Sequence, residues 1–354
     1  MKMTFRWYGK DYDKIPLEYI RQIPNVKGVI STLFNKNTDE IWLYEEILEL
    51  KEYIEKHNLQ LYGIESLNVS EDIKAATNLR DEHIANYIQS LENLGKNNIK
   101  LVCYNFMPIF DWTRTNLNKI NEDGSSSLEY KQEIIDKIDY INMFDRMSLE
   151  TNGSILPGWD KNKINKLESL FKLYKDINEE DLFNNLIYFL KAIMPTCKKY
   201  NIKMAIHPDD PAWPIMNIPR IIINKENIQR ILNEVDDELN GITLCTGSLA
   251  TNTNNDILSL IDTFKDRIHY VHIRNIKHLD DKSFIETIHN SEYGELDIYQ
   301  IIKKLHDINY QGFIRPDHGR NIFDENGAPG YGLYDRALAI NYFNGLYEAI
   351  LKSK

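Results

Sequence analysis

The sequence has few cysteines, no long apolar run and no apolar segment near its start. Three cysteines in 354 residues, Cys103, Cys197 and Cys245, do not form a disulfide framework, so reduced thiols are expected and one is free to bind metal. No apolar run approaches the roughly 20 residues of a membrane-spanning helix, and the first residues lack the apolar core of a signal peptide. We therefore expect a cytoplasmic protein with no membrane partner.

Basic residues are also in deficit. The formal net charge of -11 would repel a phosphate backbone, so the composition argues against nucleic-acid binding and disfavours an endonuclease. A small anionic substrate remains compatible with this charge, because a local arginine or metal cluster could hold it.

Three further patterns are missing. No GxGxxG follows the first predicted strand, which argues against a dinucleotide fold. No zinc-finger spacing is present, and no linker rich in proline, glycine or serine divides the chain. With 42% hydrophobic residues, the length suits one barrel with insertions or two smaller domains, and the absence of a linker favours one domain over residues 1–354.

Strand-like and helix-like stretches alternate along most of the chain. Amphipathic runs such as 45–58 and 227–240 separate apolar runs that are predicted as strands. The eight predicted strands are 4–9, 26–34, 59–67, 99–106, 202–208, 241–247, 267–275 and 312–319. This alternation implies parallel strands, and eight repeats predict an α/β fold of the (β/α)8 TIM-barrel class.

One interval, at about 107–200, breaks the alternation after the fourth strand. It holds a polar stretch at 121–127 and two helical patterns, from Leu128 to Met147 and from Ile164 to Tyr200. An insertion after the carboxyl end of a barrel strand lies on the catalytic rim, so we interpret it as a helical cap.

Four unlike metal-binding groups fall at the ends of the fifth to eighth strands: His207, Cys245, His272 and Asp317. Each alone is explained by an ordinary structural role, but their shared position favours one metal site at the rim. Two imidazoles, a thiolate and a carboxylate suit Mn²⁺, Fe²⁺, Co²⁺ or Zn²⁺ and suit Ca²⁺ poorly. The spacing favours an open catalytic site over a closed structural one.

Other polar groups are predicted at the same rim. Arg114 and Arg315 could clamp a carboxylate in a bidentate manner, and Tyr334 is a third candidate for substrate binding. His318 and Tyr331 are candidates for proton transfer near the metal. The alternative for Tyr334 is that it begins the last helix.

Several longer motifs resemble a known family. They are VCYNFMPIFDWTRT (102–115), HPDDPAWP (207–214), LCTGS (244–248), VHIRN (271–275), RPDHGR (315–320) and PGY (329–331), and together they resemble the mannonate dehydratases of hexuronate catabolism. The resemblance implies a xylose-isomerase-like barrel, a requirement for Mn²⁺ or Fe²⁺, and conversion of D-mannonate to 2-dehydro-3-deoxy-D-gluconate and water. It places the metal on His207, Cys245, His272 and Asp317, and the catalytic side chains near Asp317, His318 and Tyr331.

The chemistry of this dehydration fits the predicted site. The base removing the C2 proton is Tyr331, as phenolate, or Asp317, and the acid assisting departure of the C3 hydroxyl is His318. Arg114 and Arg315 would hold the substrate. Two alternatives remain: a metal-dependent sugar isomerase or epimerase on a related barrel, and a catalytically silent sugar-acid-binding protein. We also expect a homo-oligomer, dimer or tetramer, with an interface on the insertion.

Overall fold

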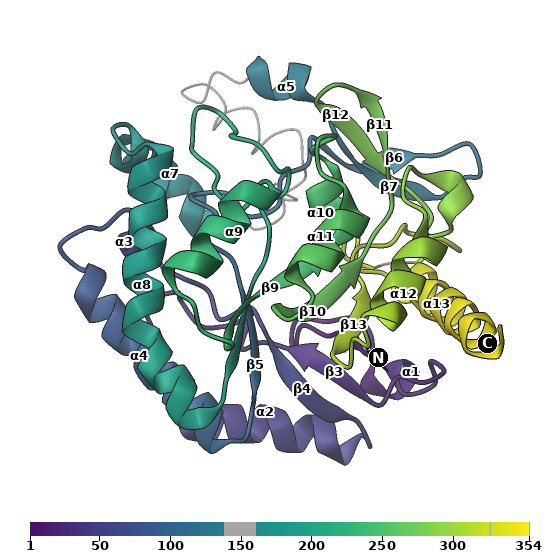
Figure 1. The fold of residues 1–354 in the computed structure, drawn as a ribbon, viewed down its shortest axis with the longest axis horizontal. Helices are drawn as coiled ribbons and strands as arrows, with labels where there is room; N and C mark the ends of the chain where they lie inside the picture. Colours follow the sequence, from purple (N-terminus) through teal and green to yellow (C-terminus); the bar gives the residue numbers. More distant parts are fainter. Residues whose placement is uncertain (138–160, 326, 354) are drawn as a thin grey trace.

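The computed structural model describes residues 1–137, 161–325 and 327–353, and its centre is a parallel sheet that closes on itself (Figure 1). The order of the strands is β1-β13-β10-β9-β8-β5-β4-β3-β2. Their bounds are β1 Lys2–Met3, β2 Phe5–Arg6, β3 Gly28–Ser31, β4 Gln60–Glu65, β5 Leu101–Tyr104, β8 Lys203–Ile206, β9 Asn240–Cys245, β10 Ile268–Ile273 and β13 Phe313–Pro316.

The barrel closes at a seam formed by β1 and β2, where the beginning of the chain meets the last strand. β1 pairs with β13, whereas β2 pairs with β3. Between them, Thr4 donates its backbone N–H to Ile314 O at 2.9 Å and its hydroxyl to Gly28 O at 2.9 Å. β1 and β2 are therefore two halves of one strand, and the nine strands amount to eight. The predicted (β/α)8 barrel is confirmed.

The barrel strands are rich in apolar residues because most of their positions are buried on both faces of the sheet. Every residue of β5, β9 and β10 is buried, as expected where helices cover the outside of a parallel sheet and side chains fill the inside. The helices around the sheet are α1 Leu17–Ile20, α2 Tyr44–Lys56, α3 Glu71–Lys74, α4 Arg80–Lys96, α8 Glu179–Tyr200, α9 Lys225–Glu234, α10 Thr246–Ala250, α11 Ile257–Phe264, α12 Ile298–Asp307 and α13 Tyr334–Lys352.

Side-chain caps define where several of these helices begin. Asn178, Asp256 and Asp297 accept hydrogen bonds from backbone N–H groups in the first turns of α8, α11 and α12. No helix in the described part of the chain is long and apolar enough to cross a membrane.

The segment after β5 begins with strands, which the sequence did not predict. β6 (Asn116–Ile120) and β7 (Ser126–Tyr130) form a hairpin, and β7 pairs with β12 (Ser283–Glu286), which pairs with β11 (Ile276–Asp280). The helix expected from Leu128 is therefore wrong for residues 128–130. Its remainder is α5 (Gln132–Asp136) and residues 138–147, which lie outside the described residues.

Long-range pairing explains this difference. The ring of Tyr130 stacks on Phe284 of β12 at 5.5 Å between centroids, a partner far along the chain that local periodicity cannot reveal. Further along the insertion, α7 (Lys161–Tyr174) and α8 are helical as predicted, but α8 packs beside α4 on the outside of the barrel and is not part of a cap. The four strands form a small second sheet (Figure 1).

Candidate metal centre and active site

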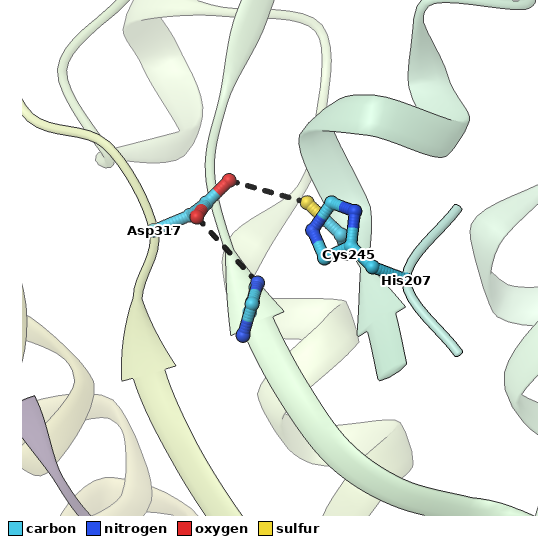
Figure 2. A group of neighbouring side chains, drawn as sticks. His207, Cys245 and Asp317 are labelled. Carbon is cyan, nitrogen blue, oxygen red and sulfur yellow. Dashed lines mark hydrogen bonds and ion pairs between the residues drawn. The ribbon is translucent and has the colours of Figure 1, made fainter. Parts of the chain in front are cut away.

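The carboxyl ends of four neighbouring strands bring His207, Cys245, His272 and Asp317 together. Figure 2 labels three of them, His207, Cys245 and Asp317. His207 directly follows β8, Cys245 ends β9, His272 is the penultimate residue of β10 and Asp317 directly follows β13. One ligand atom from each lies within 4.8 Å of all the others. His269, three residues before His272 on β10, lies instead against Gly241 near the beginning of β9, so it cannot join the group.

The donor set of this cluster fits a divalent metal ion. The Cys245 Sγ and Asp317 Oδ2 atoms are 3.2 Å apart, and both residues are buried. Burial, and next the Asp317 carboxylate, raise the pKa of the Cys245 thiol. A cation between the two atoms would remove this conflict, because it stabilises the thiolate and the carboxylate together.

The two histidines are also suited to ligate metal. His207 Nδ1 lies 2.8 Å from Pro208 O, so it donates its hydrogen there and leaves the Nε2 lone pair available. Burial, and next Arg315, lower the pKa of His272 to about 4, which keeps the imidazole neutral as a metal ligand must be. His272 Nδ1 lies 3.5 Å from Asp317 Oδ1, and Nε2 lies 3.4 Å from Glu65 Oε2.

Asp317 is held as a carboxylate. Burial alone would raise its pKa, but His318 and then Arg315 outweigh burial and keep the pKa well below the ordinary value of 3.8. Arg315 Nη2 approaches Asp317 Oδ1 at 3.1 Å. The side chain is thus fixed in the charged form before any metal binds.

Arg114 is placed differently from what the sequence predicted. Its guanidinium is fully buried and donates to Asp210 Oδ1 at 2.9 Å, Asp210 Oδ2 at 3.0 Å, Glu286 Oε1 at 2.9 and 2.5 Å, and Thr113 O at 2.7 Å. These contacts use all five N–H groups of an arginine. Arg114 could bind a substrate only by giving up one of these bonds, so the geometry assigns it to the support of the site.

Most of the N–H groups of Arg315 also donate to acceptors within the protein. Nη1 donates to Pro316 O and Asp317 O, and Nη2 lies 2.7 Å from Glu65 Oε1. Its Nε has no hydrogen-bond partner among the described residues. Arg315 therefore shapes the loop that carries Asp317, with one N–H left over.

Tyr334 lies outside the cluster. It is the first residue of α13, is 45% exposed, and its ring contacts Phe323, which is 77% exposed. The alternative reading of the sequence, in which Tyr334 begins the last helix, matches this position.

His318 and Tyr331 form a pair next to the cluster of His207, Cys245, His272 and Asp317. His318 Nε2 lies 3.0 Å from the Tyr331 hydroxyl. The Gly319 N–H donates to Gly330 O at 2.8 Å and joins the two loops, and Gly330 has φ +80 with His318 3.4 Å from where a Cβ would stand. Burial, and next Tyr8, raise the pKa of Tyr331 well above 10, so its resting form is the neutral phenol. A free phenolate at Tyr331 is therefore disfavoured.

Sequence reasoning missed a buried charge network behind this pair. Asp210 accepts from Arg274 Nη2 at 2.7 Å and from Ser248 Oγ at 3.1 Å, and the same hydroxyl oxygen lies 3.0 Å from Cys245 Sγ. Glu286 accepts from Arg274 Nη1 at 3.0 Å. Asp210 lies in the HPDDP motif and could have been noticed there, whereas nothing in the local sequence around Glu286 signals its role.

Comparisons with known proteins agree with this geometry. The family model described as D-mannonate dehydratase (UxuA) matches residues 1–354. A curated relative from Brachyspira hyodysenteriae, named mannonate dehydratase, is 53% identical over 352 residues, which cover 99% of each chain. The crystal structure of mannonate dehydratase from Streptococcus suis serotype 2 superposes with a TM-score of 0.89 and 42% identity, covering 100% of this chain and 95% of that one.

A more distant structure supports the type of barrel. The xylose isomerase domain protein from Planctomyces limnophilus shares 9% identity and a TM-score of 0.56, with 99% of both chains covered, so it shares the fold alone. The family model that matches residues 1–354 and the relative of 53% identity show the family as well as the fold. The chain belongs to the D-mannonate dehydratase family.

Proposed function

We propose that this chain is a metal-dependent hydro-lyase that converts D-mannonate to 2-dehydro-3-deoxy-D-gluconate and water. Membership of the family supports this reaction. The single observation that carries the metal requirement is the His207, Cys245, His272 and Asp317 cluster, with ligand atoms within 4.8 Å of one another. We assign proton transfer to the His318 and Tyr331 pair, which adjoins the cluster because His318 follows Asp317 in the chain.

We assign Mn²⁺ or Fe²⁺ to this cluster, because a mixed set of nitrogen, sulfur and oxygen donors suits a borderline divalent ion. His207, Cys245, His272 and Asp317 would hold the ion. When bound, it would supply Lewis-acid stabilisation of the negative charge that develops on the substrate oxygens.

The protein side chains would move the protons. Tyr331 takes the C2 proton while its own hydroxyl proton passes to His318 Nε2, 3.0 Å away. His318 then delivers that proton to the departing C3 oxygen, which leaves as water, and the resulting enol tautomerises to the 2-keto product. This relay avoids a free phenolate, which the raised pKa of Tyr331 disfavours.

We assign direct substrate binding to fewer residues than the sequence suggested. Of the two predicted arginines, Arg315 retains an Nε–H without a described partner, so it is our candidate for a direct contact. Arg114 would act by holding Asp210 and Glu286 in place. A homo-oligomer and a cytoplasmic location stay predictions.

A product assay tests the function. Protein dialysed against a chelator should lose activity, and added Mn²⁺ or Fe²⁺ should restore formation of a 2-keto-3-deoxy acid from D-mannonate. D-gluconate is the comparison substrate, and an aldose-ketose or epimer product would indicate an isomerase or epimerase. Turnover by the chelated protein would contradict the metal requirement. Calorimetric binding of D-mannonate without product after long incubation would indicate a silent binding protein.

Tyr331→Phe tests the relay. Removing the hydroxyl should lower kcat by a factor on the order of 100 to 10,000, the usual contribution of a positioned acid or base. The Mn²⁺ content of the variant should be unchanged, because Tyr331 is not among the four clustered ligands. Near wild-type turnover would exclude the phenol as the base.

A further inference from the structure

Glu286, on β12 of the small sheet, reaches the side of His318 that faces away from Tyr331. His318 Nδ1 lies 2.9 Å from Glu286 Oε1 and 3.0 Å from Oε2, while Nε2 faces the Tyr331 hydroxyl. The three side chains therefore form a continuous line from carboxylate to imidazole to phenol. Glu286 and His318 are both almost fully buried, so solvent does not compete for these contacts.

The contacts of Glu286 decide which nitrogen of His318 carries the hydrogen. A carboxylate only accepts, so two oxygens at 2.9 and 3.0 Å from Nδ1 require an Nδ1–H. Arg274 Nη1 also lies 2.9 Å from Nδ1 and would favour the opposite tautomer, but it has another acceptor in Glu286 Oε1. Glu286 Oε2 has His318 as its donor in the described structure. The Glu286 carboxylate therefore determines the tautomer: Nδ1 carries the hydrogen, and the Nε2 lone pair faces Tyr331.

Glu286 is itself rigidly held. It ends β12, in register with Ile276 of β11, and β7 flanks β12 on the other side. Arg114 and Arg274 both donate to Oε1. The small sheet thus places the Glu286 carboxylate at the rim of the barrel in a fixed position. A histidine keeps one tautomer only when the hydrogen-bond partner of its other nitrogen is fixed in this way.

We propose that Glu286 is a positioning residue for the dehydration, which fixes His318 in the Nδ1–H tautomer so that Nε2 can accept the proton of Tyr331. The inference rests on the proposed function, because it gives the His318 and Tyr331 pair a third member. The rival view is that Glu286 only neutralises Arg114 and Arg274. Asp210 makes that view testable, because it pairs with the same two arginines and, within the described part of the chain, forms neither a hydrogen bond nor an ion pair with His318.

Glu286→Gln is the main test. The amide keeps the shape of the side chain, but it can turn its NH₂ toward Nδ1 and favour the opposite tautomer. We expect kcat for D-mannonate to fall at least about 100-fold, by analogy with the loss of an orienting carboxylate behind a catalytic histidine. KM should stay within about three-fold and bound Mn²⁺ should stay stoichiometric. The matched control, Asp210→Asn, should destabilise the protein and keep kcat within about ten-fold.

A second variant, Glu286→Asp, keeps the inference testable if Glu286→Gln does not fold. Glu286→Asp keeps the charge that Arg114 and Arg274 require, and it should have a kcat between those of the wild type and the glutamine variant. In a His318→Asn background, Glu286→Asp should cause no further loss of kcat, because its effect passes through the imidazole.

The outcomes separate the inference from the function. Wild-type protein that forms no 2-keto-3-deoxy acid would overturn the proposed function and this inference with it. If the wild type is active, either of two results would overturn the inference and leave the function standing. The first is an equal loss of kcat in Glu286→Gln and Asp210→Asn. The second is a further loss of kcat when Glu286→Asp is added to His318→Asn.

Discussion

Asp210 is buried between two arginines, and its replacement by asparagine measures how far the fold depends on this charge network. The carboxylate is 1% exposed and accepts four hydrogen bonds: two from Arg114, at 2.9 and 3.0 Å, one from Arg274 at 2.7 Å and one from Ser248 at 3.1 Å. An amide in the same place keeps one oxygen acceptor and presents an NH₂ group to a guanidinium. The two buried arginines then share a single carboxylate, that of Glu286.

The expected loss is large. Removing one partner of a buried ion pair costs about 3–5 kcal/mol, because the remaining charge is left uncompensated. Native proteins have only about 5–15 kcal/mol of stability in total, so Asp210→Asn should remove a substantial fraction of it. With a urea slope of about 3 kcal/mol/M, the midpoint of unfolding should fall by about 1 to 1.7 M.

Urea unfolding followed by tryptophan fluorescence measures this shift. Glu180→Gln is the matched control, because Glu180 forms a bidentate pair with Arg230 on the exposed surface. Water replaces the lost partner there, so the midpoint should not change measurably. The reasoning is refuted if Asp210→Asn shifts the midpoint no more than Glu180→Gln does.

Three further predictions follow from the site and its surroundings. Cys245→Ser should retain little Mn²⁺ after dialysis, measured by elemental analysis, whereas Cys197→Ser, in α8, should retain all of it; equal retention would remove Cys245 from the ligands. Tyr334→Ala should keep KM for D-mannonate within about two-fold, because the side chain points to solvent, and a ten-fold rise would restore its predicted role in substrate binding. His318, Arg274 and Arg114 overcome burial and lower the pKa of Glu286 to about 2, so its stabilising contribution is present above pH 4.5 and is lost as pH falls through 2; in acid titrations Glu286→Gln should flatten this part of the stability curve.

The barrel could be predicted because its strands carry a local signal. Parallel strands buried on both faces appear in the sequence as nearly continuous apolar runs, and each of the eight predicted runs overlaps a barrel strand. The metal candidates were found for a related reason, since each stands at the end of such a run. Glu65 also stands at the end of β4 and could have been noticed in the same way.

What the sequence could not supply are the contacts between distant segments. β7 is a strand because Phe284 and its neighbours pair with it, and the local pattern around Leu128 resembles a helix equally well. Arg114 looked like a clamp for substrate because its two buried carboxylate partners, Asp210 and Glu286, lie far away in the chain. Unpaired arginines and paired ones look the same until the fold is known.

The seam at Thr4 has a consequence for how the chain is made. Lys2 and Met3 leave the ribosome 311 residues before their partners Phe313 and Ile314. Contacts between such distant positions form late, because a long loop must close before they gain anything. During translation, the first strand can pair early with β3 but must wait for β13. Until then, one edge of the nascent sheet stays open, and a chaperone that shields this edge would act on the chain at that stage.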